Sequence, residues 1–315
     1  MFSNEIKYLI LIVVAIVLIV FIILRKIVEE VFNKTILEKR KDKDEMIKEM
    51  KERYKCNYED YNDIPYEEIV ITNEDGHKIK GYYYIPNENS DKTIIIHHGY
   101  KASHYVCLQF AEIFFNLGFN ALLVDMRSHG ESQGEYITYG LKEREDLNLW
   151  VDLIRNKIGK DGIIGLHGQS MGGATVLMYG GKYEDKIDFI IADCAYSNGK
   201  EIIRRELKKS NIPFFTVYYL VNRKIKKICG FDMNSISPKD EIKSSKTPVL
   251  FIHGTADKLV PYEMSVEMYN EKAGENDKLL LIEGAAHVEA YATNKELYIK
   301  TVEDFIRNVK NEIII

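Results

Sequence analysis

Cysteine is scarce in this 315-residue chain, and its four cysteines lie far apart. They form no C-x-x-C pair and no Cys/His cluster with the spacing of metal ligands, which excludes a disulfide framework, a zinc site or a redox motif as the organising feature. We therefore expect reduced, mostly buried thiols, with neither a metal nor another cofactor. The cysteines are Cys56, Cys107, Cys194 and Cys229.

A surplus of basic residues is also missing, because the formal net charge is −5. Without a basic surface, nucleic acid is not an expected partner. Internal repeats and Pro-rich or Gly/Ser-rich linkers are absent too, which excludes a solenoid or a string of linked modules. The length then leaves room for one sizeable α/β domain with an appendage, or for two small domains.

A long hydrophobic run is present near the N-terminus, where 17 consecutive apolar residues extend from Tyr8 to Leu24. This is just long enough to cross a bilayer. A cleaved signal peptide would have a basic start and a small-residue exit, and the sequence has neither, so residues 1–28 are predicted to be a retained transmembrane anchor. A buried core helix is the alternative, but no polar face interrupts the run.

The orientation of this anchor follows from the basic residues around it. They are more numerous after the span, from Arg25 onward, than before it. The positive-inside bias therefore predicts a single-pass protein of the cell membrane with its main body in the cytoplasm. The unpaired cysteines agree with a reducing compartment.

A charged segment follows the anchor, with 14 charged residues among the 18 from position 38 to 55. Only Met46, Ile47 and Met50 form a thin apolar stripe in it. Residues 29–60 are therefore predicted to be a solvated helical stalk. A coiled coil that binds a partner is the alternative, although the apolar seam is short.

The remainder, residues 61–315, has the pattern of an α/β domain. Two β-rich runs flank Glu74-Asp75-Gly76, which is a hairpin turn signal. After them, short apolar strands alternate with amphipathic helices, which predicts a mostly parallel, doubly wound sheet with right-handed crossovers. The predicted buried strands include residues 93–97, 121–124, 189–193, 248–253 and 278–282.

The interval of about 196–237 breaks this alternation. It contains a charged helical segment, Lys200 to Ser210, followed by an aromatic-rich one, Ile212 to Leu220. We interpret the interval as a short helical lid inserted after a strand. A buried helix packed on the main core is the alternative.

The stretch that indicates chemistry is Gly168-Gln169-Ser170-Met171-Gly172, between an apolar strand and a helix. G-x-S-x-G in a strand–turn–helix context is the pattern of a nucleophile elbow, where strained backbone makes the serine project and only glycine fits beside it. Ser170 is thus the candidate nucleophile, with Gly168 and Gly172 as the elbow glycines. A tight connection in which a small serine simply fits is the alternative.

An acyl-transfer serine needs a base and an acid, and both are expected on loops after later strands. Asp257 follows the strand that ends at His253, and His287 follows the strand that ends at Ile282. The chain order Ser170, Asp257, His287 is the one this architecture uses. Glu283 is the nearest competing carboxylate.

An oxyanion would have to be met by fixed N–H donors. One is the backbone N–H of Met171, directly after the nucleophile. The other is expected from the loop after the strand ending at His97, where Tyr100 is the better candidate.

Other histidines also lie at strand ends: His97, His98, His167 and His253. No pair of them has ligand spacing with a carboxylate, so they are expected to be hydrogen-bonded structural residues and not metal ligands.

Taken together, these motifs resemble the α/β-hydrolase superfamily from about Tyr66 to the C-terminus. The sequence is most similar to bacterial single-domain serine hydrolases of the serine-aminopeptidase and monoacylglycerol-lipase-like branch. The motifs are His98-Gly99, Asp125-x-Arg127-x-His129-Gly130-x-Ser132, Gly168-x-Ser170-x-Gly172-Gly173, His253-Gly254-x-x-Asp257 and His287.

The resemblance implies structural roles for Asp125, Arg127 and His129 in the loops beneath the site. Ser128 stands where the family usually has glycine, and the N-terminal anchor and stalk lie outside the resemblance.

The sequence therefore predicts a membrane-anchored serine hydrolase that cleaves a small-molecule or lipid carboxylic ester through an acyl-enzyme. One alternative is a serine aminopeptidase-like enzyme, which would need an acidic pocket for the substrate amine. Another is a catalytically silent hydrolase-fold protein that serves as a tethered binding or scaffold module.

Overall fold

The computed structural model describes residues 4–37, 42–53, 56–209, 214–272 and 274–313. Its centre is an eight-stranded sheet with strand order β1-β2-β4-β3-β5-β6-β7-β8. β2 pairs antiparallel with β1 and β4, and the remaining neighbours pair in parallel, so the predicted mostly parallel, doubly wound sheet is confirmed. The strands are β1 (Tyr66–Thr72), β2 (Lys78–Tyr84), β3 (Lys92–His97), β4 (Asn120–Val124), β5 (Ile163–Gln169), β6 (Phe189–Asp193), β7 (Val249–Gly254) and β8 (Lys278–Ile282).

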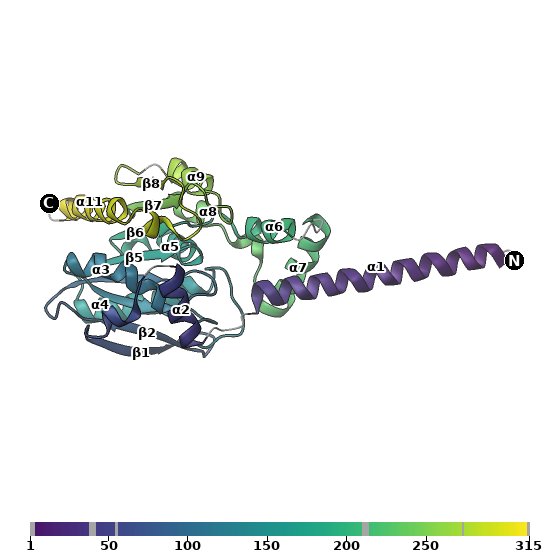
Figure 1. Ribbon diagram of the computed structural model, residues 1–315, viewed down its shortest axis with the longest axis horizontal. Coiled ribbons are helices and arrows are strands. Elements are labelled where there is room, and N and C mark those ends of the chain that lie inside the picture. The colour runs from purple at the N-terminus through teal and green to yellow at the C-terminus, as the bar shows by residue number, and fades with distance from the viewer. Residues whose placement is uncertain (1–3, 38–41, 54–55, 210–213, 273, 314–315) are drawn as a thin grey trace.

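Helices cover both faces of this sheet (Figure 1). α3 and α11 share one buried apolar cluster with the sheet, and α4, α5, α8 and α9 share another on the opposite face. The central strands are buried on both sides, which is why they appear in the sequence as uninterrupted apolar runs. The helices of the body are α2 (Lys43–Arg53), α3 (Leu108–Asn116), α4 (Glu143–Ile158), α5 (Met171–Lys182), α6 (Gly199–Lys209), α7 (Phe214–Cys229), α8 (Pro238–Ile242), α9 (Glu263–Lys272), α10 (Ala290–Thr293) and α11 (Lys295–Ile313).

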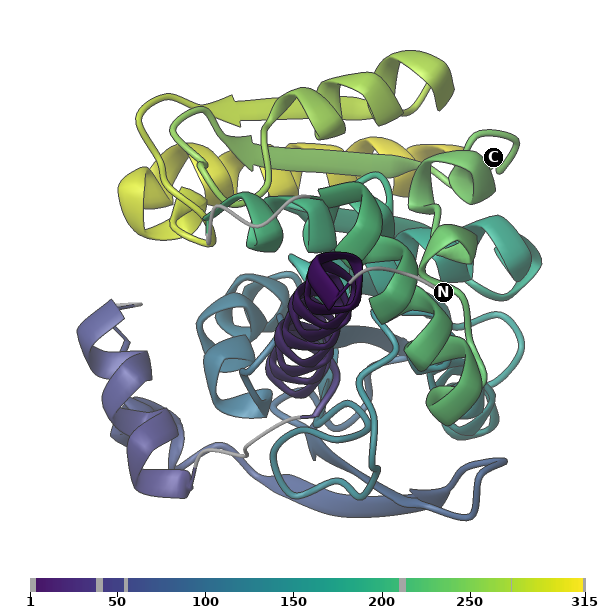
Figure 2. The same ribbon diagram turned by 90° about the vertical axis from the view of Figure 1, so that its right-hand side faces the viewer.

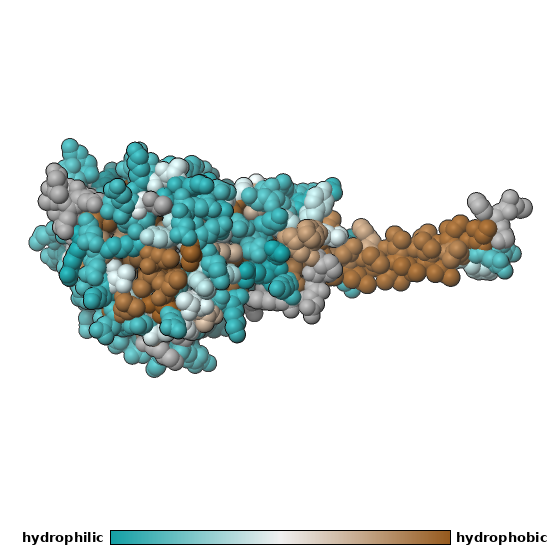
Figure 3. Space-filling model, turned by 90° about the horizontal axis from the view of Figure 1, so that it is seen from above, coloured by the Kyte–Doolittle hydropathy of each residue, from teal (hydrophilic) through white to brown (hydrophobic). Residues whose placement is uncertain are grey.

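A single long helix, α1 (Asn4–Ile36), projects from the body (Figure 1). Most of the surface of its projecting part is apolar (Figure 3). Among the described residues it is the one helix long and apolar enough to cross a membrane, with a mean hydropathy of 3.3 over its most apolar window. Its large side chains are exposed as far as Ile23 and become buried from Val28 onward. The helix extends about two turns beyond the predicted anchor of residues 1–28.

The expected solvated stalk over residues 29–60 needs correction. Residues 29–36 continue α1 and pack on α7, with Phe32 and Ile36 buried. α2 lies on the body, where Met46 and Met50 are buried in the same cluster as α3 and α11. The thin stripe of α2 therefore suffices for docking, because apolar side chains one turn apart share a helix face. Residues 38–41 and 54–55 lie outside the described residues.

The interval predicted as a lid contains two helices, α6 and α7, at the end of the body from which α1 projects (Figures 1 and 2). α6 matches the predicted charged helix closely, whereas α7 extends nine residues beyond Leu220, to Cys229. The two helices bury apolar side chains against α1 and the loops around Ser170, and not against the sheet. Residues 210–213 lie outside the described residues.

Candidate active site

Ser170 occupies the sharp turn between β5 and α5. Its backbone has φ 55° and ψ −112°, a conformation that costs a non-glycine residue free energy and that occurs where strain is built into a site. A Cβ atom on Gly168 would lie 2.2 Å from the Gly172 carbonyl oxygen, and one on Gly172 would lie 2.3 Å from the His97 carbonyl oxygen. Both positions therefore require glycine, as the motif predicts.

The structure brings the three side chains of the predicted triad together. Ser170 Oγ lies 2.9 Å from His287 Nε2, and His287 Nδ1 lies 2.6 Å from Asp257 Oδ2. They come from loops at the carboxyl ends of β5, β8 and β7, which meet at one edge of the sheet because these strands are parallel. Glu283, the competing carboxylate, is exposed and is not part of this chain of hydrogen bonds.

Asp257 is held as a carboxylate. Burial alone would raise its pKa, but hydrogen bonds from His253 and His287 and from the backbone N–H of Val260 hold the pKa well below its usual range. A carboxylate can only accept hydrogen bonds, so His287 carries its proton on Nδ1 and leaves Nε2 to accept from Ser170. This is the tautomer that a general base needs.

His253 is a functional neighbour that the sequence analysis assigned only a structural role. Its Nε2 lies 3.2 Å from Asp257 Oδ2 and 2.9 Å from the Val260 carbonyl oxygen, and its Nδ1 lies 2.7 Å from Ser265 Oγ. Since both partners of Nε2 are acceptors, Nε2 carries the proton and donates to them. His253 thus fixes the carboxylate that orients His287. The His253-Gly254-x-x-Asp257 spacing was the available signal.

The predicted oxyanion donors lie on either side of Ser170. Met171 is the first residue of α5, so its N–H has no carbonyl acceptor within the helix. The loop that carries Tyr100 passes directly beside the nucleophile, since a Cβ on Gly99 would be 3.4 Å from the Ser170 Cβ. Both residues line the same pocket as Ser170.

The loop after β4 has the structural role that the resemblance implies. Asp125 accepts from the His104 and Glu131 backbone N–H groups, and Arg127 holds Asp146 through two hydrogen bonds of 2.7 and 2.6 Å. Burial would raise the pKa of Asp125, but His104 lowers it to about 2. The hydrogen bonds to Asp125 and the Arg127–Asp146 ion pair thus fix the loops beneath the site.

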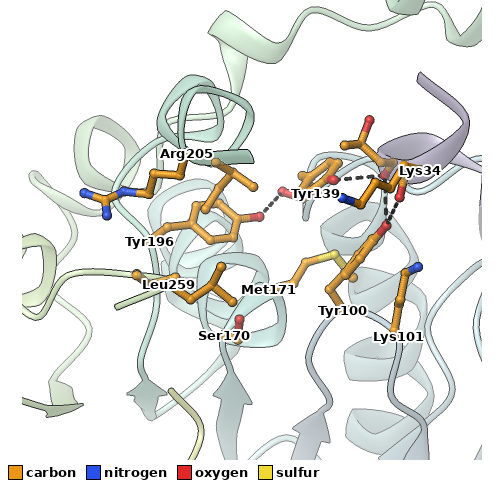
Figure 4. Close-up of a pocket in the computed structure, with 12 residues that line it drawn as sticks. Lys34, Tyr100, Lys101, Tyr139, Ser170, Met171, Tyr196, Arg205 and Leu259 are labelled. Atoms are coloured by element: carbon orange, nitrogen blue, oxygen red, sulfur yellow. Dashed lines mark hydrogen bonds between the residues drawn. The ribbon is translucent and has the colours of Figure 1, made fainter. Parts of the chain in front are cut away.

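A pocket of about 270 Å³ opens above Ser170 (Figure 4). Apolar side chains, among them Ile202, Leu259 and Val260, form much of its wall. The basic residues Lys34, Lys101 and Arg205 also line it, and no carboxylate does so within the described parts of the chain.

The last turn of α1 forms one side of this pocket. Its final carbonyl groups accept no hydrogen bond from within the helix. They accept hydrogen bonds from residues of the body instead. The Tyr100 hydroxyl donates to the Lys34 carbonyl at 2.7 Å, the Tyr139 hydroxyl donates to the Thr35 carbonyl at 2.9 Å, and the Ile137 N–H donates to Ile36 at 3.1 Å. The pocket wall is therefore built partly from the apolar helix (Figure 4).

Donor atoms of Cys194, Asp257 and His287 lie within 4.8 Å of one another, which raises the question of a metal. Burial raises the pKa of Cys194 well above its ordinary value, so its thiol is neutral and a poor ligand. The other two side chains bind each other and Ser170. The donor set fits a hydrogen-bonded dyad better than a metal site.

Comparison with known proteins agrees with this architecture. Residues 92–214 match the model of a family described as having the alpha/beta hydrolase fold. The protein YqkD of Bacillus subtilis is 33% identical over 275 residues, which cover 87% of this chain and 90% of YqkD.

Two further relatives are more distant. The membrane protein YNL320W of Saccharomyces cerevisiae is 24% identical, over 78% of this chain and 81% of that protein. The esterase Pf2001 of Pyrococcus furiosus has a similar solved structure, with a TM-score of 0.64 and 27% identity, covering 80% of this chain and 94% of the esterase.

Proposed function

Because the chain belongs to the α/β-hydrolase family and is related to esterases, we propose that it is a membrane-anchored serine hydrolase. The enzyme cleaves carboxylic esters through an acyl-enzyme. One observation carries the proposal: a continuous chain of hydrogen bonds runs from Ser170, which lines the pocket, through His287 to Asp257.

The first half of the proposed reaction acylates Ser170. As Oγ attacks the ester carbonyl carbon, its proton passes to His287 Nε2, and the Asp257 carboxylate stabilises the resulting imidazolium. The carbonyl oxygen becomes an oxyanion, which the N–H groups of Met171 and Tyr100 bind. Collapse of this intermediate breaks the ester bond, and the leaving alcohol takes the proton from Nε2.

The second half removes the acyl group. Nε2 accepts a proton from a water molecule, whose oxygen attacks the carbonyl carbon of the acyl group bound to Ser170 Oγ. The same two N–H groups bind the second oxyanion, and its collapse releases the carboxylic acid and returns the proton to Ser170 Oγ.

The pocket lining favours an ester over a peptide N-terminus. A substrate ammonium group would need a carboxylate, whereas the charged groups that line the pocket in the described residues are Lys34, Lys101 and Arg205. Within the family we propose the serine-aminopeptidase and monoacylglycerol-lipase-like branch, with the lipase-like members as the better match for substrate. An apolar pocket wall suits a lipophilic acyl group.

We also propose that α1 anchors the protein in the cell membrane as a single span, with residues 61–315 as the catalytic domain on the cytoplasmic side. The relatively high number of basic residues after the span supports this orientation. α6 and α7 then form a short lid over the site.

The test is hydrolysis of p-nitrophenyl esters by the purified full chain. Ser170→Ala should abolish turnover, because no other group in the proposed reaction supplies the nucleophile. Ser245→Ala is the matched control at a buried serine before β7, whose hydroxyl binds the Thr247 N–H and no residue of the proposed reaction. Turnover that persists in Ser170→Ala would refute the mechanism.

A further inference from the structure

The positive charge of this acidic protein is concentrated beside α1. α6 and α7 together hold nine Lys and Arg residues and two Glu residues, a charge of +7 in a chain whose total is −5. The surface they form, which we call the basic helix pair, therefore has the opposite sign to the rest of the molecule. Such segregation favours a polyanionic partner.

Among the described side chains, three carboxylates pair with this surface. Glu29 of α1 pairs with Lys224, Glu201 pairs with Arg204 at 3.4 Å, and Asp232 pairs with Lys226 at 2.5 Å. Other basic residues of the pair, such as Lys208 and Arg223, are exposed to solvent.

Aromatic side chains are exposed on the same surface. Phe215 is 85% exposed and Tyr219 is 64% exposed, both in the first turns of α7. Phe214, next to them, lies under Lys200 and Arg204, whose charged groups are 5.9 and 5.8 Å from its ring. Aromatic rings interleaved with Lys and Arg are the combination found where a protein meets lipid headgroups.

The basic helix pair lies where α1 would enter a bilayer. α7 packs along the last turns of α1, with Lys224 bound to Glu29 and positioned 4.4 Å from the centre of the Phe32 ring. The apolar part of α1 is exposed up to Ile23, one turn before this contact region begins. Figures 1 and 2 show both helices of the pair beside the base of α1, at the end of the body from which it projects.

We propose that the basic helix pair binds the anionic lipid headgroups of the leaflet that α1 enters, and thereby holds the mouth of the pocket at the membrane surface. Lys and Arg side chains attract anionic headgroups over about a Debye length, and Phe215 and Tyr219 insert at headgroup depth. The basic helix pair complements the leaflet in charge, because it is positive and the headgroups are negative, and in position, because it lies beside the span.

The consequence for substrate depends on the proposed ester hydrolysis. Ile202 and Arg205 of α6 and Lys34 of α1 line the pocket above Ser170, so the pocket opens between the two elements that meet the bilayer. An ester lipid of the same leaflet reaches Ser170 without crossing water. The substrate class is therefore a membrane-resident acyl ester, and a water-soluble ester is the competing outcome.

The membrane contact is tested with the full chain reconstituted into vesicles of phosphatidylcholine, with or without phosphatidylglycerol. Phe215→Trp introduces an indole as a depth probe, and the native Trp150 is buried and supplies a constant background. Brominated lipids should quench the introduced indole in the anionic vesicles, and added salt should reduce the quenching. Equal quenching in neutral and anionic vesicles, or none in either, would overturn the proposal.

Charge variants supply the matched control. Lys208→Glu with Arg223→Glu, in the Phe215→Trp background, should lower the ratio of docked to undocked protein by about tenfold or more. Lys160→Glu with Lys246→Glu removes the same charge from exposed sites before β5 and β7, at the opposite edge of the sheet, and should leave the ratio unchanged. Equal effects of both pairs would refute a localised contact.

Hydrolysis separates this inference from the proposed function. The double variant Lys208→Glu with Arg223→Glu should hydrolyse a vesicle-borne acyl ester more slowly than the wild type. Its rate with a short soluble ester should be unchanged. Loss of both activities in Ser170→Ala, together with no effect of the charge pair on either substrate, would uphold the hydrolase and refute the membrane route. Quenching of the indole in anionic vesicles without any ester turnover would uphold the membrane contact and refute the hydrolase.

Discussion

Asp257 connects two histidines with different tasks. Its Oδ2 receives hydrogen bonds from His287, which faces Ser170, and from His253, which is buried behind it. Its Oδ1 receives the N–H groups of Leu259 and Val260, each at 2.8 Å. With both oxygens fixed, the carboxylate has one orientation, and the proton of His287 is confined to Nδ1.

Replacing Asp257 by Asn should lower kcat for p-nitrophenyl butyrate by about 10³- to 10⁴-fold. The carboxamide can donate to Nδ1, which favours the tautomer with its proton on Nε2, where it cannot accept from Ser170. The KM should change little, because Asp257 does not line the pocket. A kcat within tenfold of the wild type would contradict the assigned tautomer.

Asp193, at the end of β6, is a buried carboxylate that the proposed reaction does not use. Burial raises its pKa to about 6 from an ordinary 3.8, although His253, Gln169 and other neighbours oppose the shift. Since the pKa is raised in the folded state, the folded protein binds the proton more tightly than the unfolded chain. The contribution of Asp193 to the free energy of unfolding is therefore greatest below about pH 4 and is lost as the pH rises through about 6.

The prediction for Asp193→Asn follows from that sign. At pH 7 and above the variant should be more stable than the wild type by up to about 3 kcal/mol, because it no longer carries the buried charge. Near pH 4 the difference should disappear. Urea unfolding at pH 4 and pH 8 measures the difference in the free energy of unfolding. A variant that is less stable than the wild type at pH 8 would show that the buried charge of Asp193 does not destabilise the folded protein.

Among the elements, α1 has the most informative junction with the body. Three groups of the body, the hydroxyls of Tyr100 and Tyr139 and the N–H of Ile137, bind the carbonyls of its last turn. The helix is thus docked on the same loop that supplies the proposed oxyanion donor of Tyr100.

Tyr139→Phe should loosen this junction, because it removes one hydrogen bond worth about 1 kcal/mol. Hydrogen exchange of the Ile137 amide should become about fivefold faster, provided that it exchanges by local opening. Tyr183→Phe, which removes a hydroxyl bound to Glu145 far from α1, is the control. Unchanged protection of Ile137 in Tyr139→Phe would count against a docked helix.

The elements that sequence could predict are those whose own residues determine them. The strands are uninterrupted apolar runs such as Ile94 to Ile96, and Ser170 was found because its turn demands Gly168 and Gly172. The docking of Phe32 and of Met46 was not predicted. A short apolar stripe is buried only where residues distant in the sequence form an apolar surface that fits it. His253 was underestimated for the same reason: its partner is a side chain whose position depends on the loop after β7.

At the scale of the whole molecule, the last turns of α1 belong both to the apolar helix and to the pocket. A chain that begins at Arg25 keeps Phe32, Lys34 and Thr35, and should hydrolyse a short soluble ester at the rate of the full chain in detergent. A chain that begins at Leu37 loses this wall and exposes the apolar face of α7 formed by Val217, Val221 and Ile225.

For the shorter chain we expect at least a tenfold lower kcat/KM, an effect of about 1.4 kcal/mol, and a tendency to aggregate. Equal turnover by both truncated chains, compared at one concentration of monomeric protein, would show that α1 is only a tether.

The nucleophilic role of Ser170 is tested by covalent labelling of the full chain with a fluorophosphonate, followed by mass spectrometry of its peptides. We expect one adduct, on Ser170, which forms much more slowly in His287→Ala because the base that activates the hydroxyl is gone. Absence of labelling, or an adduct on another serine, would contradict that role.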